Sequence, residues 1–184
     1  MINPGDKIHN SRTGQTMLFI QTSSSSNGQL LEIDCVSPPT GVKEPEHIHP
    51  LQENNFRILS GSCMFSLNGK ERLVEAGNSI SIPSNTPHFF YNSGKEACHY
   101  IQEFRPALHI EEFFETFFIL SNNGKLNKHG IPNLLHGSVI MLKHLNEIRV
   151  TNPPWIIQVL TYYTLAPIGY LFGYRSSNKS TKRH

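Results

Sequence analysis

Residues 41–61 read GVKEPEHIHPLQENNFRILSG, and this stretch decides how the fold is interpreted. It carries two histidines, His47 and His49, separated by one residue. Alternate side chains of a strand point to the same face, so both imidazoles face one way if this stretch is extended. Residues 77–92, GNSISIPSNTPHFFYN, add a third histidine, His88, among proline, glycine and asparagine turn signals. Because transition metals take imidazole nitrogens that converge from separate segments, the pattern predicts that these three histidines share one metal ion inside a small β-barrel.

The segments around the two stretches predict a mainly β protein. Short apolar runs recur between turn signals, and the pair Asn68-Gly69 is a strong signal for a type I′ hairpin turn. Many short strands at even spacing, with no helical pattern between them, indicate a barrel or a sandwich. Besides the histidine stretch, the expected strands are residues 15–22, 30–36, 56–59, 63–67, 70–74, 79–82, 88–91 and 98–104.

The spacing within the two stretches resembles the paired motifs of the cupin superfamily. The first runs from Gly41 through the two histidines to Gly61, and the second runs from Gly77 through His88 to Asn92. This resemblance implies a double-stranded β-helix, or jelly-roll, barrel with a metal site. It implies no particular reaction, because one fold hosts many chemistries.

A narrower resemblance covers nearly the whole chain. The run from Glu46 to Glu53, together with Arg105-Pro106-Ala107-Leu108, is similar to bacterial cupin 2 conserved barrel proteins that carry a helical C-terminal extension. The residue pattern changes at the same place. Apolar residues at helical spacing begin at Ile110 and stop near Asn122-Asn123-Gly124, which predicts an amphipathic helix.

A second helix is expected from Pro132 to about Arg149, before a proline pair. We therefore expect a cupin β-barrel domain at residues 1–106 and an α-helical extension at residues 107–184.

The fourth metal ligand in the family is usually a glutamate, and Asn54 occupies that position here. Glu53 stands one residue earlier. If Asn54 faces the barrel interior, Phe56 follows it inward, whereas an inward Glu53 would bring Arg57 in as well, an expensive burial. We expect Asn54 at the ligand position, with Glu53 as the alternative. An amide is a poorer ligand than a carboxylate for a hard dication, so a three-histidine site with open water positions is the expected form.

Two further features bear on the site. Asn85 stands where the family usually has glycine, and asparagine tolerates a positive φ better than most residues. Pro87 biases the residue before it toward extended geometry and so helps to aim His88. Four residues could line a pocket, although packing in the core is the default expectation for each: Gln52, Met64, Phe90 and Tyr91. The histidines without ligand spacing are expected at the surface or at caps, and they are His9, His99, His109, His129, His136, His144 and His184.

These features leave more than one function open. The first is an enzyme, a small-molecule dioxygenase or isomerase by resemblance, with one divalent Fe, Mn, Ni or Zn ion and a small organic molecule as its substrate. The second is a non-catalytic module that binds a small ligand or a partner and has a degenerate metal site, as Asn54 suggests. The plainest alternative is that the three histidines are ordinary core residues without metal.

Composition excludes some classes and sets the compartment. The net charge is +2, and no zinc-finger spacing or RNA-binding signature occurs, so no nucleic-acid partner is expected. The three cysteines, Cys35, Cys63 and Cys98, are odd in number and scattered, which argues against a disulfide framework. The chain opens with no basic-then-apolar signal pattern. We expect buried thiols and a cytoplasmic protein.

Residues 154–174 form an uncharged apolar stretch. It is long enough to span a bilayer by length alone, but two of its four tyrosines, Tyr162 and Tyr163, lie at the centre rather than at the rims. Docking on the barrel or across a homodimer is therefore favoured, and membrane association through these residues is the alternative. The basic end, residues 175–184, is expected to fray.

Overall fold

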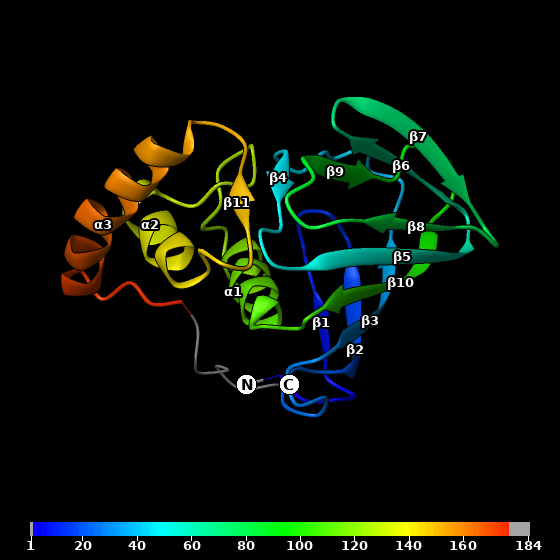
Figure 1. The fold of residues 1–184 in the computed structure, drawn as a ribbon, viewed down its shortest axis with the longest axis horizontal. Helices are drawn as coiled ribbons and strands as arrows, with labels where there is room; N and C mark the ends of the chain where they lie inside the picture. Colours follow the sequence, from blue (N-terminus) through cyan, green and yellow to red (C-terminus); the bar gives the residue numbers. More distant parts are fainter. Residues whose placement is uncertain (1, 177–184) are drawn as a thin grey trace.

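The structure is a computed structural model that describes residues 2–176 and places a two-sheet barrel beside three helices (Figure 1). One sheet has the order β1 (Lys7–His9), β2 (Thr16–Gln21), β3 (Leu31–Ser37), β10 (Cys98–Arg105), β5 (Glu53–Ser60) and β8 (Ser79–Ile82). The other has the order β11 (Arg149–Val150), β4 (His47–Ile48), β9 (His88–Tyr91), β6 (Ser62–Leu67) and β7 (Lys70–Glu75). Every pairing is antiparallel. The predicted β-barrel with a helical extension is confirmed.

Alternation of apolar and polar residues along the strands forms the barrel core. On β3, Leu31, Ile33 and Cys35 are fully buried, while the residues between them are partly exposed. Four aromatic rings from different strands pack at centroid distances of 4.9–5.8 Å, and they belong to Phe56, Phe65, Phe90 and Tyr100. The three cysteines are buried free thiols, as the sequence predicts.

Turn residues hold the strands in register. Asn68 and Gly69 have φ values of 50° and 76°, so the hairpin between β6 and β7 is the predicted type I′ turn. Asn85 has φ of 59°, which confirms that asparagine carries the left-handed position where the family usually has glycine. Its backbone N–H donates to the carbonyl of His49 at 2.9 Å, so this turn also supports a histidine of the site.

Gly61→Ala should destabilise the barrel by about 3 kcal/mol. Gly61 has φ of 72°, and a Cβ there would lie 2.6 Å from the carbonyl oxygen of Ala97. The left-handed conformation alone costs an L-residue about 1–2 kcal/mol, and the backbone clash adds to it. Gly77→Ala is the matched control, because Gly77 has φ of 83° but no atom within 4 Å of the new Cβ. Urea unfolding of both variants measures the difference; equal losses would contradict the prediction.

The helical extension lies beside the barrel (Figure 1) and lines a cavity together with it. It comprises α1 (Ile110–Asn122), α2 (Leu134–Lys143) and α3 (Trp155–Leu171). The first helix ends where predicted, but the second was predicted too long. It stops at Lys143, and Arg149–Val150 forms β11, which pairs with the histidine strand β4. The free edge of β4 offers backbone partners to this segment, so tertiary pairing overrides helix propensity. The division into residues 1–106 and 107–184 stays a prediction.

The apolar stretch at residues 154–174 folds mainly as α3, which lies against α2 at the outer side of the molecule (Figure 1). Within residues 2–176, no helix combines the length and the apolarity needed to cross a membrane. The predicted frayed end falls largely on residues 177–184, which lie outside the described residues.

Candidate metal centre

The structure brings the three predicted histidines together inside the barrel. His47 lies directly opposite His88 in the pairing of β4 with β9, and His49 follows β4 immediately. The ring centroids are 4.5 Å apart for His47 and His88, 5.1 Å for His47 and His49, and 5.3 Å for His49 and His88. One nitrogen from each ring lies within 4.8 Å of the others, and all three side chains are buried. This arrangement could hold one metal ion.

Each ring is oriented by a backbone carbonyl. The Nδ1 atoms of His47, His49 and His88 lie 2.9, 2.5 and 2.7 Å from the carbonyl oxygens of Pro45, Glu147 and Thr86. Because a carbonyl only accepts, Nδ1 carries the proton and the Nε2 lone pair is left free. The buried Nε2 of His88 has no hydrogen-bond partner among the described residues. The donor set therefore fits a transition metal ion, which would satisfy this nitrogen.

Burial keeps the three imidazoles neutral. Desolvation lowers the pKa of His47 to about 3, helped by the nearby His88 ring. Desolvation also lowers the pKa of His49 well below its usual value, with smaller effects from the other two rings. The pKa of His88 is lowered by the same cause. Since only a neutral imidazole binds a metal, the site is ready for metal binding at neutral pH.

Asn54 lies inside the barrel and Glu53 lies outside. Asn54 is 2% exposed, and its Oδ1 accepts a hydrogen bond from the Nε2 of Gln102 at 3.2 Å. Glu53 is exposed, and its Oε1 accepts from the Asn55 amide and the Ser81 hydroxyl. The alternation argument thus gives the correct faces. The sequence interpretation missed Gln102, although its place on β10 between inward Tyr100 and Phe104 could have revealed it.

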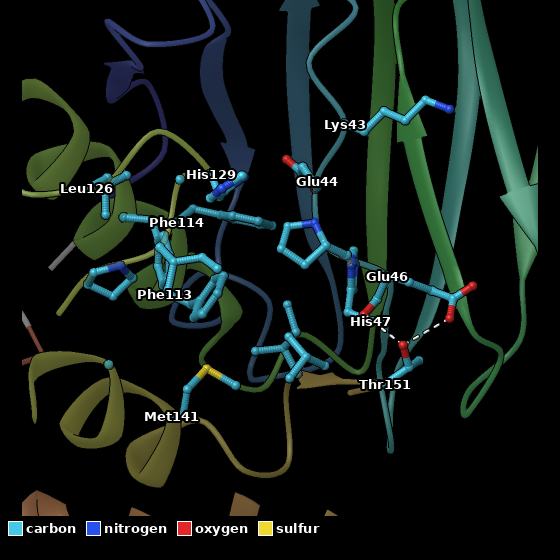
Figure 2. Close-up of a pocket in the computed structure, with 18 of the residues that line it drawn as sticks. Lys43, Glu44, Glu46, His47, Phe113, Phe114, Leu126, His129, Met141 and Thr151 are labelled. Atoms are coloured by element: carbon cyan, nitrogen blue, oxygen red, sulfur yellow. Dashed lines mark hydrogen bonds between the residues drawn. The ribbon is translucent and has the colours of Figure 1, made fainter. Parts of the chain in front are cut away.

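His47 and His49 line a cavity of about 690 Å³, whose wall is formed by the barrel and the extension together. Figure 2 shows His47 and Glu44 facing the same space as Phe113 and Phe114 of α1 and Met141 of α2. Its wall is mainly apolar. Rings and thioethers that line it are Met17, Phe90, Phe104, Phe113, Phe114, Phe117, Phe118, Met141 and Tyr162.

Of the four pocket candidates, only Phe90 lines the main cavity. Gln52 instead donates to the carbonyls of Pro106 and Ala107, at 3.0 and 2.9 Å, and so ties the end of the barrel to the extension. The helical residues that complete the wall were predicted as a helix face but not as part of a pocket.

Two of the remaining histidines are buried, and one of them, His144, is the C-cap of α2, a capping role of the kind expected. His144 is fully buried, with its ring edge-on to Phe113 and its Nε2 3.2 Å from the hydroxyl of Ser176. His136 is 8% exposed and stacks on Tyr174. The expectation was wrong for His136, which is neither exposed nor a cap because the segment that follows α3 covers its ring.

Two antiparallel sheets that enclose three buried imidazoles define a small β-barrel with a candidate mononuclear metal site. Residues 35–104 match the family model described as a cupin domain. These residues contain both motifs, and the match supports the predicted resemblance to the cupin superfamily.

Two curated proteins are similar in sequence to part of this chain. Quercetin 2,3-dioxygenase of Bacillus subtilis (strain 168) is 29% identical over 77 residues, which is 42% of this chain and 23% of that protein. The HTH-type transcriptional regulator PuuR of Escherichia coli (strain K12) is 24% identical over 107 residues, which is 58% of this chain and 57% of that protein. The chain therefore spans between 23% and 57% of the length of these relatives.

Solved structures with similarity to the chain include two bacterial proteins. KdgF from Halomonas sp. has a TM-score of 0.46 and 15% identity, covering 60% of this chain and 87% of that chain. A predicted oxalate decarboxylase from Thermotoga maritima has a TM-score of 0.49 and 21% identity, covering 58% of this chain and 99% of that chain.

Proposed function

We propose that this protein is a metal-dependent cupin enzyme that acts on an apolar, ring-containing small molecule. The observation that carries the proposal is the convergence of three buried neutral imidazoles, two of which, His47 and His49, line a 690 Å³ cavity. His47, His49 and His88 would hold one divalent Fe, Mn, Ni or Zn ion. When bound, such an ion polarises substrate oxygen atoms or supports chemistry with dioxygen, which agrees with a dioxygenase or isomerase class.

The cavity wall supports the proposed substrate class. The volume falls within the range of small-molecule sites, about 300–1,000 Å³. Phe104, Phe113 and Phe114 offer ring faces and edges to a flat ligand. Charged side chains that line the cavity, such as Arg12 and Glu44, are exposed, while the amides of Asn54 and Gln102 are buried. This distribution favours a substrate that is neutral where it meets the histidines and polar, if anywhere, at its outer end.

Metal analysis tests the proposal. Protein purified without chelators or added metal, then examined by inductively coupled plasma mass spectrometry, should carry about one transition metal ion per chain. A hydroxylated aromatic panel screened by thermal shift and by oxygen consumption then tests the substrate class. Metal far below one per chain after reconstitution would refute the enzyme proposal.

A second function is favoured by the neutral residue at the fourth ligand position. Asn54 replaces the usual carboxylate and is already hydrogen-bonded to Gln102. A weaker metal site suits a ligand-binding module without turnover. The similarity to PuuR, a transcriptional regulator by name, supports the same function.

Asn54→Glu discriminates between the two functions. A carboxylate at this position adds a charged oxygen ligand, so metal affinity should rise about 10- to 100-fold. Glu53→Gln is the matched control, because Glu53 lies on the outer face and should leave affinity unchanged. Competition with a chelator measures both constants. Tighter metal without turnover across the panel favours the binding module, and unchanged affinity would show that residue 54 does not face the metal.

We also propose a cytoplasmic homodimer without a nucleic-acid partner. The exposed apolar residues of α3, among them Ile156, Leu160 and Leu171, support association with a second copy. Sedimentation equilibrium of the wild type and of Leu160→Glu tests it; a monomer in both cases would refute the dimer.

A further inference from the structure

The strand that carries two of the histidines is bordered by a segment from the extension. Val150 of β11 pairs with His47, and Arg149 pairs with Ile48. Just before β11, the carbonyl of Glu147 accepts the Nδ1–H of His49 at 2.5 Å. Residues 147–150 therefore contact the backbone of one candidate ligand and the ring of the other.

Gln158 of α3 attaches this segment to the helices. Its side chain is 2% exposed, and its Nε2 donates to the carbonyls of Val150 at 2.9 Å and Pro153 at 2.5 Å. Its Oε1 accepts from the hydroxyl of Tyr162 at 3.1 Å. Both Gln158 and Tyr162 also line the cavity. Because both polar atoms of the buried Gln158 amide are hydrogen-bonded, this side chain fixes the position of β11 relative to α3.

Thr151 makes a second attachment on the other side of β11. Its backbone N–H donates to the carbonyl of Glu46 at 3.0 Å, and its hydroxyl donates to the Glu46 carboxylate at 2.9 Å (Figure 2). Glu46 precedes His47 directly. The histidine strand is thus held from the extension through backbone pairing and through a side-chain contact.

We propose that Gln158 is a positioning residue of the metal centre, acting through β11 on His47 and His49. The inference rests on the proposed metal site. Loss of the amide leaves the carbonyls of Val150 and Pro153 without this donor, and β11 can then shift relative to the barrel. Because Glu147, two residues before β11, supplies the acceptor that orients His49, a shift of this segment changes ligand geometry. The extension is in this way part of the metal site and not an appendage to it.

The test compares Gln158→Leu, Gln158→Glu and Thr151→Val with Thr164→Val. Thr164 lies on α3, is exposed, and its hydroxyl donates within its own helix, so it is the matched control for Thr151→Val. Each protein is stripped of metal and titrated with Co²⁺ against a chelator. Both Gln158 variants should bind about 10-fold more weakly and show altered visible absorption bands of bound Co²⁺. Thr151→Val should also weaken Co²⁺ binding and alter the absorption bands, and Thr164→Val should match the wild type in both.

A metal-free readout separates this inference from the proposed function. The Nδ1–H of His49 should give a slowly exchanging imidazole proton resonance in the apo protein, and its exchange should accelerate in the Gln158 and Thr151 variants. If the wild type binds no Co²⁺, the proposed function fails and this resonance still tests the positioning. Affinity, spectrum and exchange within twofold of wild type in a folded Gln158 variant would overturn the inference. If neither Gln158 variant folds, Thr151→Val gives the answer by the same criteria.

Discussion

The double variant His47→Ala/His88→Ala should lose metal affinity by at least about 10³-fold. It removes two of three converging imidazoles, and the remaining ring with neutral Asn54 cannot compete with water for a dication. Metal content measured by inductively coupled plasma mass spectrometry after reconstitution and desalting should fall from about one ion per chain to near zero. Turnover on any substrate that the wild type converts should fall with it.

His99→Ala is the control for this experiment. His99 lies on β10, its Nε2 is 2.8 Å from the Asp34 carboxylate, and it is partly exposed outside the site. This variant should keep its full metal content. Unfolding of both apo variants by urea shows whether the barrel survives. Full metal content in a folded double variant would mean that the ion binds elsewhere, and the proposed site would be refuted.

The positions of the candidate ligands could be predicted because they follow from spacing along strands. The one-residue gap between His47 and His49 places both rings on one face, and alternation places Asn54 with Phe56 inside. The positive φ of Asn85 follows from its residue type in the same local way. Local rules of this kind need no knowledge of the rest of the chain.

The surroundings of the ligands could not be predicted because they depend on tertiary contacts. Nothing in the residues near Val150 shows that they pair with β4, and the helical pattern before them favoured a longer helix. The acceptor for His49 lies 98 residues further along the chain. Likewise, the burial of His144 depends on Ser176, which reaches it only after α3 has turned the chain back. The helical residues of the cavity wall were therefore predicted only as one face of a helix, and not as part of a cavity.

The apo protein should lose stability as the pH falls below about 6.5, the ordinary pKa of histidine. Burial lowers the pKa of His47 to about 3 and that of His144 to about 4. Protonation therefore favours the unfolded chain. The stability given by the neutral rings is present above pH 6.5 and is lost as the pH falls toward the folded values. At pH 5, protonation of each ring in the unfolded chain should lower the free energy of unfolding by about 2 kcal/mol, so the two rings together should lower it by about 4 kcal/mol.

Two carboxyl groups with raised pKa values have the opposite effect, because they stabilise the folded protein as the pH falls. The measurement therefore has to separate their effect from that of the histidines. Enclosure by surrounding atoms raises the pKa of Glu44 to about 7, although its side chain is solvent-exposed and water screens much of that effect. Burial also raises the pKa of Glu147. Urea unfolding at pH 7.5 and pH 5 is therefore compared between the wild type and His47→Gln/His144→Gln, both with metal removed. Between these pH values the wild type should lose about 4 kcal/mol more than the double variant. Equal losses in the two proteins would show that these histidines are not held neutral by burial, and the argument for a metal-ready site would lose its electrostatic basis.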